Sequence, residues 1–150
     1  MRHIPIISAL DLLKAVKKEF PKCDIFISAC AVSDYRPRLK IKTKLKKENK
    51  KIFLELLPNP DVLATVAKNK KGQFCVGFAL ENSIDIRLAQ NKMGEKNCDL
   101  MVLNDLSSMG GEAMKASLLL KNGTVWNLGK LKKKECAKKI CQAILKSQPK

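Results

Sequence analysis

The stretch "QFCVGFALENSIDIRLAQNKMGEKNCDLMVLND", residues 73–105, decides the fold class. Its first part, 73–79, and its last part, 98–105, are short and nearly continuously apolar, which is typical of strands buried on both faces of a sheet. The segment between them predicts a helix opened by Ser83. A strand, a helix and a strand in this order predict a parallel β–α–β unit.

The segments near the amino terminus follow the same alternation. Ser8 and Asp11 have the spacing of a capping box, and apolar residues then recur at helical spacing, which predicts a helix over about 9–20. "CDIFISACAV", residues 23–32, contains β-branched residues in an apolar run and predicts another strand covered on both faces, ending near Cys30.

Two more elements are expected before residue 73. "IFLELL", residues 52–57, alternates as a strand does, and "PNPDVLATVAKN", residues 58–69, predicts a helix. Asn59 is the expected N-cap of that helix, with Pro60 at its first position.

The carboxyl-terminal part predicts a hairpin and a helix. Asn122-Gly123 lies between two apolar runs, which is the strongest short-range signal for a β-hairpin. A closing helix of about fifteen residues follows, with an apolar stripe formed by Leu131, Ala137, Ile140, Cys141, Ile144 and Leu145.

Together these elements predict an α/β fold that is Rossmann-like and three-layered, with a mostly parallel sheet and an antiparallel carboxyl-terminal hairpin. The length of 150 residues favours a single domain over 1–150. Ligands of such folds bind beyond the carboxyl ends of the strands, which directs attention to residues 30–47, 79–83 and 104–112.

Composition excludes several classes of protein. No apolar run approaches the roughly 18 residues of a membrane span, so a soluble cytoplasmic protein is expected. The only histidine is His3, which disfavours a histidine-based zinc site or a Ser-His-Asp triad. No Cys-x-x-Cys pair occurs, and reduced, mostly structural thiols are expected at Cys23, Cys30, Cys75, Cys98, Cys136 and Cys141.

The net charge of +16 is concentrated in two places. Residues 38–51 carry +7 and residues 130–150 carry another +7, so a basic loop and one face of the last helix account for most of it. One interpretation is a nucleic-acid-binding module. Aromatic residues make up only 5% of the chain and are not interleaved with the basic ones, which disfavours that interpretation.

Three features are candidates for binding an anion, and each also has a purely structural explanation. Asp34 with Lys44, Lys46 and Lys47 follows a strand end and is either a mobile cationic loop or a solvated hairpin. Lys92 and Lys96 lie on one helical face and either grip a phosphate chain or are ordinary surface lysines. Residues 59–61 offer backbone N–H groups to an anion or form a plain helix cap.

Two common nucleotide signatures are missing. The sequence has neither Gly-x-Gly-x-x-Gly nor a P-loop. The residues by themselves therefore indicate an α/β domain with a cationic site at the strand ends, suited to a phosphorylated small molecule.

Several separated blocks resemble one family. They are "CDIFISACAVSDYRP", "KLKK" nine residues after Tyr35, "LPNPDVLATV", "CVGFALEN", "AQNKMGEKNCDLMVLND" and "KKKECAKKICQAI". In order and spacing, from about residue 8 to the end, they are similar to bacterial phosphopantothenoylcysteine synthetase, the CTP-dependent phosphopantothenate–cysteine ligase. That family often forms the carboxyl-terminal half of a bifunctional coenzyme A biosynthesis protein that includes a flavoprotein decarboxylase.

The resemblance implies a ligase that joins 4′-phosphopantothenate to cysteine through an acyl-cytidylate made from CTP. It implies Mg²⁺ with CTP, a homodimer, and no residue of the chain assigned as a metal ligand. It also implies that Lys44 is catalytic. The residues it implies for nucleotide binding are Ser28, Ala29, Cys30, Asp34, Lys44, Pro60, Asp61, Val62, Leu63, Phe78, Lys92 and Lys96.

The sequence departs from the family pattern in three places. Cys30 replaces an alanine and is expected to be a wall of the site rather than a nucleophile. The family's glycine-rich amino-terminal portion, with an asparagine that contacts the acyl intermediate, has no counterpart, so we expect an excised domain, a truncated frame or half of a split enzyme. An inactive fragment that retains only the fold is an alternative to a ligase. Residues 110–117, "GGEAMKAS", replace a segment with a Phe and Asp/Asn pattern.

Overall fold

The computed structural model describes residues 1–39, 41, 43–47, 49–81, 85–105 and 110–147. The helices in these ranges are α1 (Ala9–Glu19), a short 3₁₀ turn η1 (Phe20–Lys22), α2 (Val62–Ala67), α3 (Ile86–Glu95) and α4 (Lys133–Ser147). The strands are β1 (Ile25–Ser28), β2 (Tyr35–Pro37), β3 (Leu56–Pro58), β4 (Phe74–Glu81), β5 (Leu100–Asp105), β6 (Ala113–Leu120) and β7 (Val125–Lys132).

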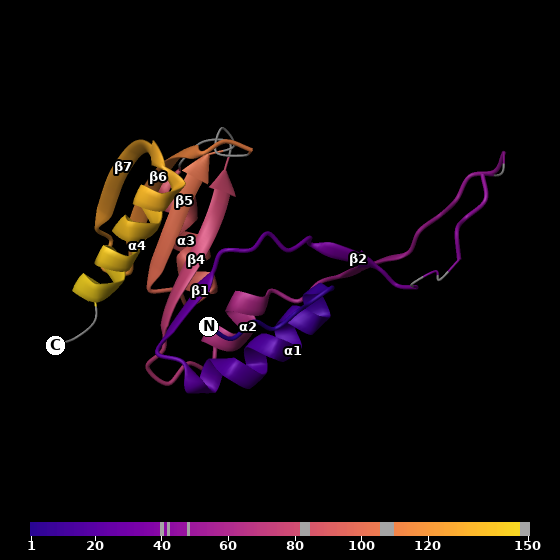
Figure 1. Cartoon of the computed structure of the whole chain (residues 1–150), viewed down its shortest axis with the longest axis horizontal. Coiled ribbons are helices and arrows are strands. Elements are labelled where there is room, and N and C mark those ends of the chain that lie inside the picture. The colour runs from indigo at the N-terminus through magenta and orange to yellow at the C-terminus, as the bar shows by residue number, and fades with distance from the viewer. Residues whose placement is uncertain (40, 42, 48, 82–84, 106–109, 148–150) are drawn as a thin grey trace.

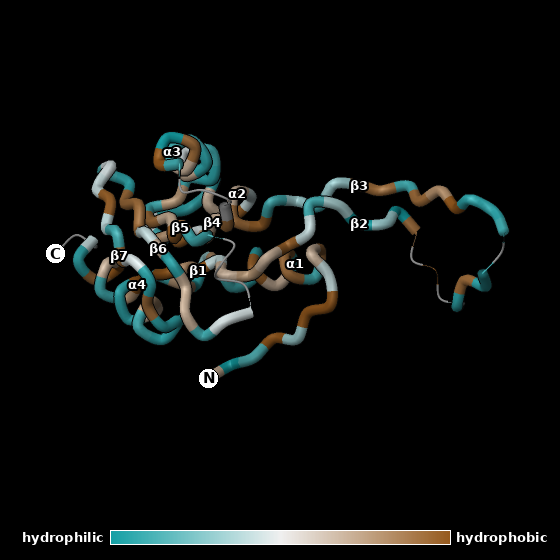
Figure 2. Tube along the Cα trace, turned by 90° about the horizontal axis from the view of Figure 1, so that it is seen from above, coloured by the Kyte–Doolittle hydropathy of each residue, from teal (hydrophilic) through white to brown (hydrophobic). Residues whose placement is uncertain are grey.

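The main sheet has the order β1-β4-β5-β6-β7 in the part of the chain that is described. β1, β4 and β5 are parallel, whereas β6 and β7 are antiparallel to their neighbours. Figure 2 shows α3 on one side of the strands and α4 on the other. The predicted three-layer α/β fold with an antiparallel carboxyl-terminal hairpin is therefore confirmed.

Two apolar clusters fill the space between these layers. The cluster below α2 and α3 comprises Phe20, Leu63, Val66, Ala67, Cys75, Ala89, Met93, Cys98, Met101, Leu103 and Leu119. The cluster below α4 comprises Val76, Leu100, Val102, Met114, Ala116, Leu118, Leu120, Cys136, Ile140, Ala143 and Ile144. Successive residues of β4 alternate between the clusters, as the period of two in a strand requires.

The helix starts test the predicted caps. α1 has the predicted capping box, in which the Asp11 N–H donates to Ser8 Oγ at 3.2 Å and the Ser8 N–H donates to Asp11 Oδ2 at 3.0 Å. α3 begins after Asp85, whose carboxylate accepts the N–H groups of Arg87 and Leu88. The predicted cap Ser83 lies outside the described residues.

The predicted N-cap of α2 is wrong. The cap is Asp61, two residues later than Asn59, and the helix begins at Val62. A carboxylate immediately before the first helical residue satisfies the orphan amides directly. Pro60 consequently precedes the helix instead of opening it.

The strand predicted over 52–57 is also wrong in extent. Only its last two residues are in a strand, β3, which pairs antiparallel with β2 in a separate two-stranded sheet. Figure 1 shows this ribbon and the segment between its strands projecting away from the main sheet. We call residues 35–58 the arm.

β1 is less covered than its apolar sequence predicts. It is the edge strand beside β4, and Ile25 and Ile27 remain 37% and 44% exposed. The prediction was a strand covered on both faces, whereas among the described strands β4 alone pairs with β1, which leaves it at the edge of the sheet.

The carboxyl-terminal elements largely follow the sequence. Gly123 has φ of +85° in the β6–β7 turn, a conformation that favours glycine. α4 has the predicted length, but its buried stripe is Cys136, Ile140, Ala143 and Ile144, while Ala137, Cys141 and Leu145 are exposed. The stripe is thus rotated by about one residue, or roughly 100° around the helix.

All six cysteines are free thiols, as predicted. Burial raises the pKa of Cys75 to about 11 and that of Cys98 to about 12. Because only the thiolate is a nucleophile, these two groups are structural.

Candidate functional site

A cavity of about 390 Å³ lies where the chain leaves β1. Ser28, the last residue of β1, pairs with Gly77 of β4, and the exposed Ala29 and Cys30 follow it. Cys30 lines the cavity. Because β1 and β4 are parallel, the cavity lies at the carboxyl end of the sheet, where ligands of this fold class bind.

The opposite wall of that cavity was missed by the sequence reasoning. Ile6, Ile7 and Ser8 line it from the segment that precedes α1. Both isoleucines are exposed, Ile7 to 92%. Residues 1–7 form neither a helix nor a strand, so no periodic pattern in their sequence predicts that they line a cavity.

Asn59 joins the arm to the end of β1. Its N–H donates to the Asp34 carbonyl at 2.7 Å, and its side-chain amide donates to the Ser33 carbonyl at 2.8 Å. Arg36 Nη1 donates to Asn59 Oδ1 at 3.2 Å and also to the Pro58 carbonyl. The residue predicted to be a helix cap therefore fixes the base of the arm and the backbone of Asp34.

Asp61 and Lys96 form a second group. Asp61 Oδ1 accepts the Ala64 N–H at 2.9 Å, and Lys96 Nζ lies 2.9 Å from Asp61 Oδ2. Partial burial would raise the pKa of Asp61, but the Ala64 N–H and the Lys96 ammonium outweigh it, so the pKa lies below its ordinary value. Asp61 is thus a carboxylate at neutral pH.

This geometry favours the plain-cap explanation for residues 59–61. The Asp61 carboxylate already occupies the amide end of α2, which has only six residues. An anion there would meet a negative charge rather than open amides. Val62 and Leu63 are each only 5% exposed and pack into the core, so their side chains are not open to a ligand.

The structure separates Phe78 from the α2 group. Phe78 packs against the cluster below α4, whereas Leu63 belongs to the cluster on the other face of the sheet. Lys92 is half-buried on α3, and Lys96, four residues later, is the C-cap of that helix. Two of the predicted residues on this side of the sheet, Lys96 and Asp61, are joined by an ion pair.

Lys44 lies in the arm and is exposed. Figures 1 and 2 both show the segment between β2 and β3 extending away from the sheet. The segment that contains Lys44 thus lies apart from the strands of the main sheet. A catalytic role for Lys44 remains a prediction.

Neither a metal cluster nor a membrane helix is found within the ranges that the structure describes. There, no three His, Cys, Asp or Glu side chains converge to hold a metal ion. A search of the same ranges finds no helix long and apolar enough to cross a membrane.

Comparison with known proteins identifies the family. Residues 1–148 match the model of the DNA/pantothenate metabolism flavoprotein C-terminal domain, and the chain belongs to that family. A coenzyme A biosynthesis bifunctional protein CoaBC from Borreliella burgdorferi is 32% identical over 144 residues, which cover 94% of this chain and 37% of that protein.

Two further relatives define how much of the family protein is present. A protein named cysteine/cysteine sulfinic acid decarboxylase, from an unknown prokaryotic organism, is 33% identical over 95% of this chain and 41% of its own length. The crystal structure of the C-terminal domain of a CoaBC protein is 31% identical, with a TM-score of 0.74, over 94% of this chain and 65% of that one. This chain thus spans less than half the length of both curated relatives.

Proposed function

We propose that this chain is the nucleotide-binding part of a phosphopantothenate–cysteine ligase of coenzyme A biosynthesis, acting in the cytoplasm with CTP. The observation that carries the proposal is the match of nearly the whole chain to the C-terminal domain of CoaBC, in both sequence and fold. The cavity at the end of β1 and the cationic Lys96 next to α2 support it.

The proposed reaction has two steps. A carboxylate oxygen of 4′-phosphopantothenate attacks the α-phosphorus of CTP, and the bond to the β-phosphate breaks to release pyrophosphate. The cysteine amine then attacks the acyl carbon of the acyl-cytidylate, loses a proton, and CMP leaves with the bonding electrons. Both steps increase negative charge on phosphate or carbonyl oxygens, which cationic side chains stabilise.

The residues of this chain would divide that work. The backbone of Ser28 to Cys30 would contact the nucleotide, and Asp34, held by Asn59, would orient it. Lys96 and Lys92 would bind the triphosphate. Lys96 forms a partly exposed ion pair with Asp61, so an incoming phosphate can compete with Asp61 for its ammonium.

Pro60, Asp61, Val62, Leu63 and Phe78 would act mainly as supports for this site. Val62 and Leu63 anchor α2 in the core, and Asp61 holds Lys96 in place. Phe78 packs on the other face of the sheet, so it would contact a nucleotide only if the nucleotide extended around the carboxyl end of β4.

Magnesium would enter with CTP rather than occupy a site built by this chain. Among the described residues no three His, Cys, Asp or Glu side chains converge, and Mg²⁺ in such enzymes is commonly bound through substrate phosphates and water. When bound, Mg²⁺ would neutralise part of the triphosphate charge.

The arm fits a role in homodimer formation. A two-stranded ribbon is marginally stable alone in water, yet the described residues of this arm include eight exposed large hydrophobic side chains: Tyr35, Leu39, Ile41, Leu45, Ile52, Phe53, Leu54 and Leu56. A second copy would supply the same apolar surface and complementary free strand edges. The proposal therefore includes a dimer joined through the arms.

Isothermal titration of the folded chain with CTP in magnesium chloride tests the nucleotide site. We expect saturable binding that Lys96→Gln weakens about tenfold, because charge-assisted hydrogen bonds contribute about 1.5–3 kcal/mol. Lys139→Gln, on the exposed face of α4, is the matched control and should change nothing. A well-folded sample that binds no CTP would refute the assignment.

A second experiment addresses the catalytic lysine and the reaction class. In a complete enzyme, Lys44→Gln should lower turnover far more than it weakens CTP binding, since the proposed role is at the reacting centre. Equal losses in both would contradict that role. Pyrophosphate release that depends on phosphopantothenate marks the ligase, whereas carbon dioxide release without CTP would favour the decarboxylase named for one relative.

A further inference from the structure

A larger cavity, of about 630 Å³, lies at the opposite edge of the sheet. Its walls come from the segments before β4 and β5, the β6–β7 turn and the end of α4. Since β4 is eight residues long, this edge is about 23 Å from the carboxyl end of the strand. The cavity therefore shares no lining residue with the cavity beside Cys30.

One side of the cavity is a fixed ion pair. Lys70 Nζ lies 2.7 and 2.6 Å from the two Asp99 oxygens and also donates to the Asn97 carbonyl at 2.9 Å. Asp99 Oδ2 additionally accepts the Cys75 N–H at 2.8 Å. The side chains of Lys70 and Asp99 are only 13% and 17% exposed, so this pair is neutral overall and rigid.

Two further lysines supply positive charge that the pair does not neutralise. Lys121 Nζ lies 3.7 Å from Asp99 Oδ1, and its side chain is 61% exposed. Lys146 Nζ lies 5.4 Å from the centroid of the Trp126 ring. The charged side chains that line the cavity are thus three lysines and one carboxylate, with a net charge of +2.

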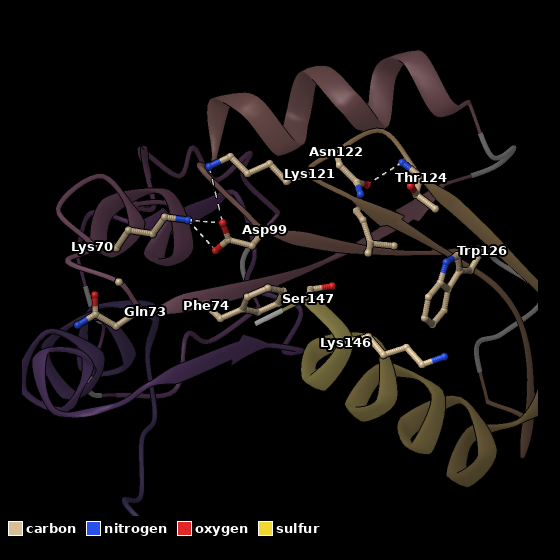
Figure 3. A pocket seen from close by; sticks show the side chains of 12 residues that line it. Lys70, Gln73, Phe74, Asp99, Lys121, Asn122, Thr124, Trp126, Lys146 and Ser147 are labelled. Atoms are coloured by element: carbon tan, nitrogen blue, oxygen red, sulfur yellow. Dashed lines mark hydrogen bonds and ion pairs between the residues drawn. The ribbon is translucent and has the colours of Figure 1, made fainter. Parts of the chain in front are cut away.

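Aromatic surface lies between these charges. Figure 3 shows Phe74 on the same side of the cavity as Asp99, and Trp126 with Lys146 on the other side. Phe74 and Trp126 are both half-buried and come from the same apolar cluster below α4. The cavity therefore combines flat apolar walls with cations, which is the chemistry that an aromatic anion requires.

The carboxyl end of α4 affects whether the cavity favours a negatively or a positively charged ligand. The last carbonyls of a helix carry partial negative charge, which by itself disfavours an anion. Lys146 lies in that last turn, and the Ser147 hydroxyl donates to the Ala143 carbonyl at 2.8 Å, so part of this negative charge is satisfied. Lys121 is on the other wall, away from the helix end.

We propose that this cavity is a second binding site, for a phosphomonoester that carries an aromatic ring and has the size of a mononucleotide. The ring packs against Trp126 and Phe74, and the phosphate binds Lys121, with Lys146 adding positive charge. Lys70 keeps its bonds to Asp99 and serves as a wall. None of the residues given a role in the proposed ligase reaction lines this cavity, so the inference stands whether or not that reaction is established.

Trp126 is the only tryptophan of the chain, so its fluorescence reports on this cavity. AMP, adenosine and inorganic phosphate are titrated into the full chain, and AMP affinity is measured independently by isothermal titration. We expect AMP to change the fluorescence with saturation, and to bind at least tenfold more tightly than adenosine or phosphate alone. Lys121→Gln should weaken AMP binding about tenfold, and added salt should weaken it as well.

The controls separate this site from the CTP site and from nonspecific attraction. Lys139→Gln, an exposed substitution outside the cavity, and Lys96→Gln should both leave the AMP response unchanged. No saturable AMP binding by calorimetry, an unchanged affinity in Lys121→Gln, or an equal loss in Lys139→Gln would each overturn the proposal. Loss in Lys96→Gln would also overturn it, because the ligand would then occupy the other edge.

Discussion

The contacts of Asp61 allow the contributions of a helix cap and of an ion pair to stability to be measured separately. Asp61 has two roles, since one oxygen caps α2 and the other binds Lys96. Asp61→Ala removes both, Asp61→Asn keeps a capping side chain but removes the charge, and Lys96→Gln removes only the ion pair. Asp61→Asn, Lys96→Gln and the double variant form a double-mutant cycle with the parent chain, and Asp61→Ala reports on the cap.

The expected magnitudes follow from exposure. An N-cap contributes about 1 kcal/mol. The ion-pair side chains are 43% and 34% exposed, so solvent screening limits their interaction to about 0.5 kcal/mol. Asp61→Ala should therefore lower the free energy of unfolding by about 1.5 kcal/mol, whereas Asp61→Asn and Lys96→Gln should each lower it by about 0.5 kcal/mol.

The pH dependence has a definite sign. The pKa of Asp61 is lower in the folded chain than its ordinary value of 3.8, because the Ala64 N–H and Lys96 outweigh the effect of burial. The contribution of its charge is thus complete above that ordinary value and is lost as pH falls through the folded pKa. The difference between the parent chain and Asp61→Asn should be present at pH 7 and should have vanished by about pH 2.

Urea unfolding monitored by circular dichroism at several pH values measures all of these quantities. Two results would refute the reasoning. If Asp61→Asn destabilised as much as Asp61→Ala, the capping interaction would contribute nothing. If the effects of Asp61→Asn and Lys96→Gln were additive in the double variant, the two side chains would not interact in solution.

Three further predictions test the arm, the core and the thiols. Phe53→Ser, at a side chain that is 90% exposed, should convert a dimer into a monomer without lowering the unfolding free energy of the monomer; light scattering that shows an unchanged mass would contradict an interface through the arm. Gly77→Ala should destabilise the chain by about 1–3 kcal/mol in a urea titration, because the new Cβ would lie 3.0 Å from Met101 Sδ and 3.1 Å from Leu63 Cδ2. Gly94→Ala is the matched control and should not destabilise the chain, because a Cβ there would have nothing within 4 Å. Burial raises the pKa of Cys75 to about 11 and that of Cys98 to about 12, so both should react with a thiol reagent at pH 8 only after unfolding. The exposed Cys30 and Cys141 should react at once, and immediate labelling of all six thiols in the folded chain would contradict the burial of Cys75 and Cys98.

Local sequence signals determined much of the fold. The apolar runs at 73–79 and 98–105, the capping box at Ser8 and the Asn122-Gly123 turn each act through neighbouring residues, so they predict strands, a helix start and a hairpin without tertiary information. The order of these elements was then enough to predict the parallel part of the sheet and its antiparallel extension. The motif blocks identified the family for a similar reason, since they preserve short-range spacing.

Tertiary structure decided what these signals could not. Residues 23–32 look like a buried strand and residues 52–57 like an alternating one, but the position of a strand depends on which strands lie beside it. β1 is an edge of the main sheet, and β3 belongs to the arm. Asn59 looked like a cap, yet its partners Ser33 and Asp34 are 25 and more residues away in sequence.

The same limit applies to the candidate sites. Phe78 shares a motif with residues on the opposite face of the sheet, because side chains alternate along β4. The cavity with Lys70, Lys121 and Trp126 gathers residues from four separate segments of the chain. The sequence by itself determined the elements and the family of this protein, whereas only long-range packing decided which side chains meet, since contact between distant segments is set by the whole fold.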